Sequence, residues 1–257
     1  VTLADAARRC GDLDQADDMA QAALKLAAER GYTKGKARAL TTRAYICFNR
    51  EDFAAALSLL SEAITLYEEL GDASSNYELA RMQLSVYFAQ GDMLRVWQQS
   101  QICLEIALRQ GSPNRIALDY NNLGVVSMLL QQYDQSRDYL AKARTLAEEI
   151  GNMWTVALTS SNLTYGYIQQ GDLASALTHF AQTVRMAEDY RLTHIVHACL
   201  FHAAMIKRLL GDPATALAWL VVTLAQSALE PDVRHVARLM RDAMRDELSA
   251  DAYTQAI

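Results

Sequence analysis

The sequence predicts an all-α fold, an α-solenoid in which antiparallel helix hairpins stack side by side. The first observation is a recurrence every 40 residues, because Gly31, Gly71, Gly111 and Gly151 occupy one column. The second is a column of turn dipeptides offset by 20 residues, at 11–12, 51–52, 91–92, 131–132, 171–172 and 211–212. The third is the composition of 51% hydrophobic residues with only 3 Pro, which is typical of continuous helices joined by short turns. A fixed period of this size indicates stacked repeats.

The period divides residues 1–230 into six expected two-helix repeats: 1–31, 32–71, 72–111, 112–151, 152–191 and 192–230. The first repeat is entered partway through its first helix, so the chain looks like a piece of something longer. Arg191 takes the place of the column glycine directly before the sixth repeat, and the sixth has Pro213 in the first turn of its second helix, where proline's missing N–H is not needed. We expect residues 231–257 to form a capping helix followed by the start of a truncated segment, because the last repeat of a stack needs a polar-backed cap.

Small residues recur where the two helices of each hairpin are expected to cross. They are Ala16, Ala56, Val96, Ser136, Ala176 and Ala216. The Gly-Asp dipeptides fit the turns, because glycine takes the left-handed helix-ending conformation and aspartate caps the next helix.

These columns resemble the tetratricopeptide repeat. The resemblance rests on Leu123, Gly124, Tyr133, Ser136 and Leu140, and in the next unit on Leu163, Tyr167, Gly171, Asp172, Ala176 and Phe180. The unit here is 40 residues rather than the usual length of about 34, as in the long-repeat superhelices of peptide-responsive bacterial regulators. The stretches 241–248 and 252–256 also resemble the end of the repeat region in large bacterial signal-transduction ATPases and LuxR-type transcription regulators.

The resemblance implies a right-handed superhelix whose first helices line a concave groove for a protein or peptide. We expect the partner-binding residues to be Arg38, Thr41, Tyr45, Arg81, Ser85, Asn121, Asn122, Val125, Ser161, Asn162, Tyr165, Phe201 and His202. Their mixture of carboxamides, hydroxyls and aromatics suits an extended peptide or a helix.

Two interpretations of the asparagines stay open. A carboxamide both donates and accepts, so Asn122 and Asn162 could bind the backbone of a ligand. Alternatively, they hydrogen-bond between neighbouring helices and bind nothing.

Several classes of function are excluded or disfavoured. The net charge of −6 argues against direct binding of nucleic acid. His194 and His197 lie one turn apart, but a closed metal site needs more ligands than they supply, so we expect no metal and no cofactor. The chain has no phosphate-binding GKS or GKT triplet and no Gly-x-Ser-x-Gly elbow, and we expect no enzyme activity.

The sequence therefore predicts a protein- or peptide-recognition module, the partner-sensing part of a larger bacterial signalling or transcription regulator. No apolar run is long enough to cross a bilayer and the four cysteines have no paired spacing, so we expect a cytoplasmic location without membrane contact. The alternative is a scaffold that self-associates as a homodimer, with Trp219, Leu220, Val221 and Val222 as candidate contacts.

Overall fold

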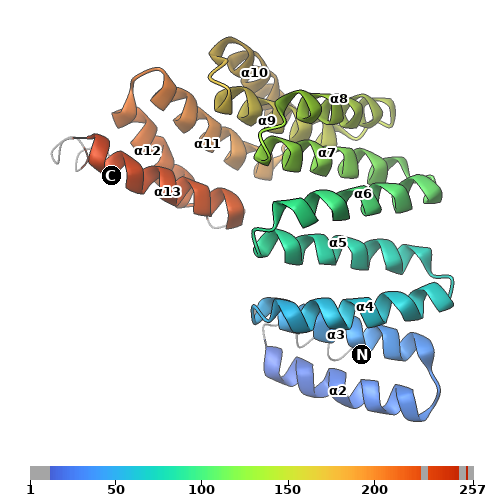
Figure 1. The fold of residues 1–257 in the computed structure, drawn as a ribbon. Helices are drawn as coiled ribbons and strands as arrows, with labels where there is room; N and C mark the ends of the chain where they lie inside the picture. Colours follow the sequence, from blue (N-terminus) through green and yellow to red (C-terminus); the bar gives the residue numbers. More distant parts are fainter. Residues whose placement is uncertain (1–11, 227–230, 249–252, 254–257) are drawn as a thin grey trace. The chain divides into compact units, whose positions relative to one another are not determined.

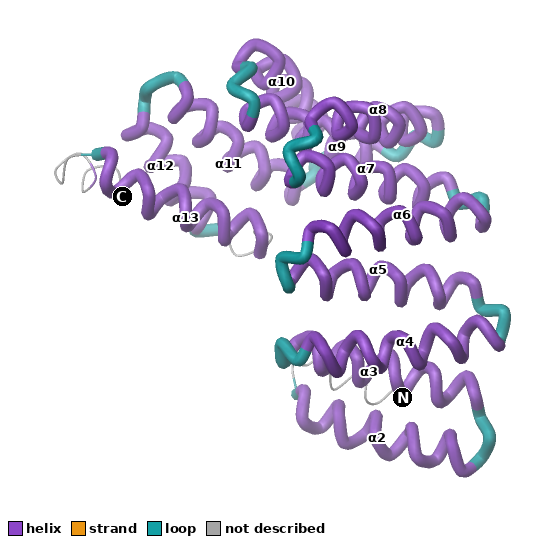
Figure 2. The backbone as a smooth tube through the Cα atoms, in the orientation of Figure 1, coloured by secondary structure: helices purple, strands orange, loops and turns teal. Residues whose placement is uncertain are grey.

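The computed structural model describes residues 12–226, 231–248 and 253, and within these ranges the regular structure is α-helical throughout (Figures 1 and 2). Consecutive helices between Leu13 and Gln110, and again between Tyr133 and Glu247, pack against each other. The predicted fold class, an all-α solenoid of helix hairpins, is confirmed. None of the helices in the described residues is long and apolar enough to cross a membrane. The division into six repeats and the hand of the superhelix stay predictions.

The chain divides into two compact units, and the boundary between Asp119 and Tyr120 falls inside α7. The helices before it are α2 (Leu13–Glu29), α3 (Thr33–Asn49), α4 (Phe53–Glu69), α5 (Ala73–Ala89) and α6 (Met93–Gln110). The boundary helix is α7 (Pro113–Leu129). The second unit continues with α8 (Tyr133–Glu149), α9 (Met153–Gln169), α10 (Leu173–Asp189), α11 (Thr193–Leu209), α12 (Pro213–Leu224) and α13 (Pro231–Glu247).

Every corner from α2 to α12 is closed by one residue in the left-handed conformation. Seven of these residues are glycines, as expected from the column pattern, and the other three are Glu51, Gln131 and Arg191, with φ between 54° and 61°. The residue that follows each corner opens the next helix. Aspartate or asparagine side chains accept a hydrogen bond from a backbone N–H three residues on, at Asp12, Asp52, Asp72, Asp92, Asn152, Asp172 and Asp212. Corner and cap together set the start of each helix.

The column of small residues is buried in both units. Its members are 0–4% exposed, namely Ala16, Ala56, Val96, Ser136, Ala176 and Ala216. At Ser136 the hydroxyl donates a hydrogen bond of 2.7 Å to the backbone oxygen of Gly124 on the partner helix. The two helices of the α7–α8 hairpin therefore cross at near contact of their backbones.

In the second unit, α13 packs against α12. Its Ala237 and Met244 are fully buried in one cluster with Leu217 and Leu220 of α12. Residues 1–11 lie outside the described residues. So does the truncated segment expected after the capping helix, apart from Tyr253, which packs against this cluster.

Substituting Gly124 with alanine is expected to destabilise the protein by about 1–3 kcal/mol, because overpacking a tight core has this cost. An added Cβ would lie 2.6 Å from Cγ of Leu140 and 3.3 Å from its backbone nitrogen. Chemical denaturation followed by circular dichroism measures the loss. Gly166→Ala is the matched control, since its Cβ would meet only the flexible Met128 Sδ at 3.1 Å. Equal losses in the two variants would contradict the close crossing.

Candidate functional site

The residues expected to bind a partner lie on the first helices of the repeats, in three columns. One column holds Thr41, Arg81, Asn121, Ser161 and Phe201; a second holds Tyr45, Ser85, Val125 and Tyr165; the third holds Asn122, Asn162 and His202. Together with Arg38 we call them the wall residues. Positions three, four and seven apart share one face of a helix, so within each helix these side chains are neighbours.

In the first unit the wall residues are accessible. Arg38, Tyr45 and Ser85 are exposed, and Thr41 and Arg81 are half-buried. The Thr41 hydroxyl donates to Ala37 O at 2.9 Å and the Ser85 hydroxyl donates to Arg81 O at 3.2 Å, so both hydrogens stay within their own helices. This part of the wall presents aromatic and guanidinium groups to solvent.

In the second unit the asparagines pair with each other across helices. Asn162 on α9 donates through Nδ2 to Oδ1 of Asn121 on α7 at 2.8 Å, and Asn121 is only 3% exposed. For Asn162 the structure therefore shows the second of the two interpretations, a hydrogen bond between helices. Asn122 and Val125 are half-buried, while Ser161 is 3% exposed. The bond occupies one hydrogen of Asn162 and leaves its carbonyl oxygen outside that pair.

At the end of the second unit, the wall residues are packed into the core. Phe201 and His202 are 4% and 5% exposed. The ring of His202 stacks on Tyr165 with centroids 6.1 Å apart, and Phe201 belongs to the buried cluster that includes Leu217 and Leu220. Burial lowers the pKa of His202 to about 4, so the imidazole is neutral at pH 7. These two side chains contribute to packing in this conformation rather than to an open surface.

His194 and His197, singled out in the sequence, lie with ring centroids 6.5 Å apart. Across the part of the chain that the structure describes, no group of three His, Cys, Asp or Glu side chains is arranged to hold a metal ion.

A buried carboxyl group, Asp119, escaped the sequence analysis. It lies on α7 in the first unit and is 1% exposed. The hydroxyl of the fully buried Tyr77 donates to its Oδ2 at 3.0 Å, and its Oδ1 has no hydrogen-bond partner among the described residues. One signal was available: Asp119 precedes the buried Leu123 and Val126 by four and seven positions, which places it on the apolar face of its helix.

The groups around Asp119 shift its pKa in opposite directions. Burial is the largest influence and raises the pKa of this carboxyl to about 6, while the Tyr77 hydrogen bond and the charges of Arg81 and Arg115 pull it down. Arg115 lies 4.3 Å from the centre of the Tyr77 ring and also bonds Glu78 at 3.0 Å. A cation over the face of a phenol ring is an attractive arrangement. The Asp119 carboxyl therefore titrates near the physiological range.

The titration of Asp119 is expected to make stability pH-dependent. Folding raises the pKa of the Asp119 carboxyl, so the protonated carboxyl favours the folded state. This contribution to stability is complete below pH 4, where the carboxyl is protonated in both the folded and the unfolded state, and is lost as pH rises through about 6. The variant Asp119→Asn removes this pH-dependent contribution to stability. The difference in unfolding free energy between Asp119→Asn and the wild type should grow by on the order of 2–3 kcal/mol from pH 4 to pH 7, since each pKa unit corresponds to about 1.4 kcal/mol.

Urea titrations at pH 4, 5, 6 and 7 measure this difference. Tyr77→Phe is the informative companion, because losing the donated hydrogen bond should move the pH-dependent part to higher pH. Parallel pH profiles for the wild type and Asp119→Asn would show that the carboxyl is not coupled to folding.

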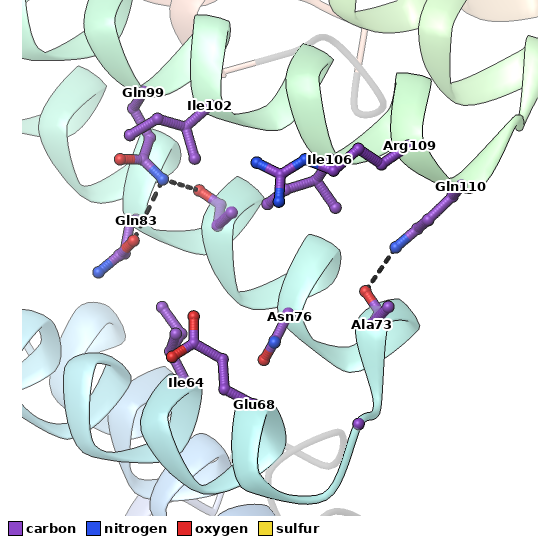
Figure 3. Close-up of a pocket in the computed structure, with 12 residues that line it drawn as sticks. Ile64, Glu68, Ala73, Asn76, Gln83, Gln99, Ile102, Ile106, Arg109 and Gln110 are labelled. Atoms are coloured by element: carbon purple, nitrogen blue, oxygen red, sulfur yellow. Dashed lines mark hydrogen bonds between the residues drawn. The ribbon is translucent and has the colours of Figure 1, made fainter.

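A cleft of about 530 Å³ lies away from the wall residues, between α4, α5 and α6 of the first unit (Figure 3). It is lined by Ile64, Glu68, Gly71, Ala73, Asn76, Ala80, Gln83, Gln99, Ile102, Ile106, Arg109 and Gln110. The repeat pattern does not predict this cleft, because it indicates which residues face the core and not how far apart neighbouring second helices lie.

Comparison with known proteins agrees with this architecture. Residues 115–189 match the family model described as a tetratricopeptide repeat. No curated protein matches the chain. Among solved structures, the apo form of RapI is similar with a TM-score of 0.77 at 16% identity, covering 99% of this chain and 94% of that one.

Two further solved structures are similar. One is BtubC from P. vanneervenii, with a TM-score of 0.66 at 17% identity, covering 91% of this chain and 92% of that one. The other is a signal transduction ATPase with numerous domains from Pyrococcus horikoshii that carries a tetratricopeptide repeat sensor. Its TM-score is 0.69 at 17% identity, over 97% of this chain and 37% of that one. Residues 115–189 thus match the tetratricopeptide repeat, and the chain has the fold of a tetratricopeptide-like solenoid that resembles the repeat regions of signalling proteins.

Proposed function

We propose that this chain recognises a protein or peptide partner through its wall residues, as the sensing part of a larger bacterial signalling or transcription regulator in the cytoplasm. The observation that carries the proposal is the accessibility of the first-unit wall. Tyr45 on α3 is 39% exposed. Phe88 on α5, which lies on the same helix face as Arg81 and Ser85, is also 39% exposed. Tyrosine and arginine are enriched at the energetic centres of interfaces.

The second-unit wall offers a way to couple binding to conformation. A peptide amide can replace the Asn121–Asn162 hydrogen bond, since a carboxamide can both donate to and accept from a backbone. A partner that binds better to the re-paired arrangement shifts the population toward it. Such a shift is the kind of change that a neighbouring effector domain can detect.

The similar structures support this role by their context. One is a Rap protein complexed with competence and sporulation factor, with a TM-score of 0.63 at 15% identity, covering 98% of this chain and 70% of that one. The ATPase from Pyrococcus horikoshii uses its tetratricopeptide repeats as a sensor. The similarity to this ATPase extends over 37% of its chain.

A displayed peptide library selected against the whole chain tests the proposal. Tyr45→Ala and Arg81→Ala are expected to weaken the selected peptides at least about tenfold, the effect of losing an interface residue worth more than about 1.4 kcal/mol. Affinity is measured by calorimetry. Leu26→Ala is the matched control, because Leu26 is 54% exposed but lies on α2, a second helix. The affinity of the Leu26→Ala variant for the selected peptides should stay unchanged.

Two outcomes would overturn the wall as the binding surface. One is a selection that yields no saturable binder. The other is a set of binders whose affinity is insensitive to Tyr45→Ala and Arg81→Ala.

Self-association is the second candidate, favoured by the exposed apolar residues of α12. Trp219 and Val222 lie three positions apart and are 38% and 50% exposed, whereas Leu220 is fully buried. A homodimer through this face should fall apart in Trp219→Lys, and light scattering across a concentration series measures the mass. A monomer at every concentration in the wild type would remove this candidate.

A further inference from the structure

The cleft between α4, α5 and α6 has the features of a built site in the first unit. On α5 its residues Asn76, Ala80 and Gln83 are turned on average about 150° from the wall positions Arg81 and Ser85, at about 100° per residue. One helix therefore separates two surfaces. A ligand in the cleft does not touch the wall.

The floor of the cleft is made of carboxamides. Gln99 is 7% exposed and donates through Nε2 to Ala80 O and to Gln83 Oε1, both at 3.1 Å. Asn76 has a buried Oδ1 with no hydrogen-bond partner among the described residues. Figure 3 shows Asn76 between the Gln99–Gln83 pair and the Gln110–Ala73 bond, which lie at opposite ends of the cleft. A buried acceptor without a donor is unfavourable, and a ligand N–H would satisfy it.

The walls of the cleft are aliphatic and its rim carries little net charge. Ile64 comes from α4, and Ile102 and Ile106 come from α6. Ile102 is 46% exposed, so an apolar side chain borders the open cleft. Glu68 and Arg109 are one acid and one base at the rim, and Arg109 is already paired with Glu105 at 2.6 Å. Because Arg109 is already paired and Glu68 keeps its negative charge, the rim disfavours an anionic ligand, and the aliphatic walls suit an aliphatic side chain.

We propose that this cleft binds an extended peptide segment of a partner protein through one backbone amide and one branched aliphatic side chain. On binding, the Asn76 amide turns about χ2, so that its Oδ1, buried in the free protein, accepts from the peptide N–H. The Gln83 amide hydrogens not used in its pair with Gln99 donate to a peptide carbonyl, and the side chain enters between Ile64, Ile102 and Ile106. The volume of about 530 Å³ falls within the range of about 300–1,000 Å³ typical of small-ligand sites. This second site is independent of the wall.

The test uses the full chain labelled with ¹⁵N and two capped probes, acetyl-Leu-Leu-amide and acetyl-Gly-Gly-amide. The side-chain amide signals of Asn76, Gln83 and Gln99 are followed by NMR during titration. The leucyl probe is expected to shift these signals saturably, while the glycyl probe shifts them weakly or not at all. Asn76→Leu should weaken the leucyl probe about two- to tenfold, the effect of one hydrogen bond.

Ile102→Ser is the second variant, which keeps the test decisive where Asn76→Leu alters folding, and it should also weaken the leucyl probe. Leu108→Ala is the matched control, because Leu108 is 51% exposed on the same helix but does not line the cleft. Tyr45→Ala should leave cleft binding unchanged, which separates this site from the wall. The proposal is overturned by equal binding of both probes, by unchanged affinity in Asn76→Leu and Ile102→Ser, or by shifts that follow self-association of the chain.

Discussion

The rest of the structure depends on how closely the two helices of each hairpin cross. Small buried side chains such as Ala56 and Ala176 allow the crossing, and left-handed corner residues turn the chain after every helix from α2 to α11. Glycine holds most corners because a Cβ is unfavourable there by roughly 1–2 kcal/mol. At Arg191 the chain accepts that cost, which shows that packing on neighbouring helices outweighs the local conformational preference.

The backbone plan could be predicted from the sequence because it depends on local rules that repeat. The Gly-Asp pairs predicted the corners and caps, and the alanine column predicted the crossings, before any contact was known. The wall was harder to predict. Periodicity placed Phe201 and His202 on the same face as Tyr45, but whether that face is open depends on contacts with other helices. Phe201 is covered in the cluster that also holds residues of α12 and α13.

Features that arise between helices were the ones that sequence reasoning missed. Asp119 meets Tyr77 across 42 positions, and the position on an apolar helix face did not identify Tyr77 as its partner. The cleft beside Asn76 exists because α4 and α6 flank α5 without filling the space between them. No single repeat contains either feature. Both concern α5, whose one side presents wall residues and whose other side presents the carboxamide floor, so this helix joins the two proposed recognition surfaces.

In a stack of repeats each 40-residue repeat packs on its neighbours alone, so that one repeat can be removed without disturbing the others. Deleting residues 32–71 joins Gly31 to Asp72, the same pair of columns that Gly71 and Asp72 form in the intact chain. Circular dichroism during urea unfolding should show unchanged helicity per residue and one cooperative transition. Deleting residues 37–66 instead breaks the register and should abolish that transition. Loss of helicity in the 32–71 deletion, as severe as in the 37–66 deletion, would contradict the account.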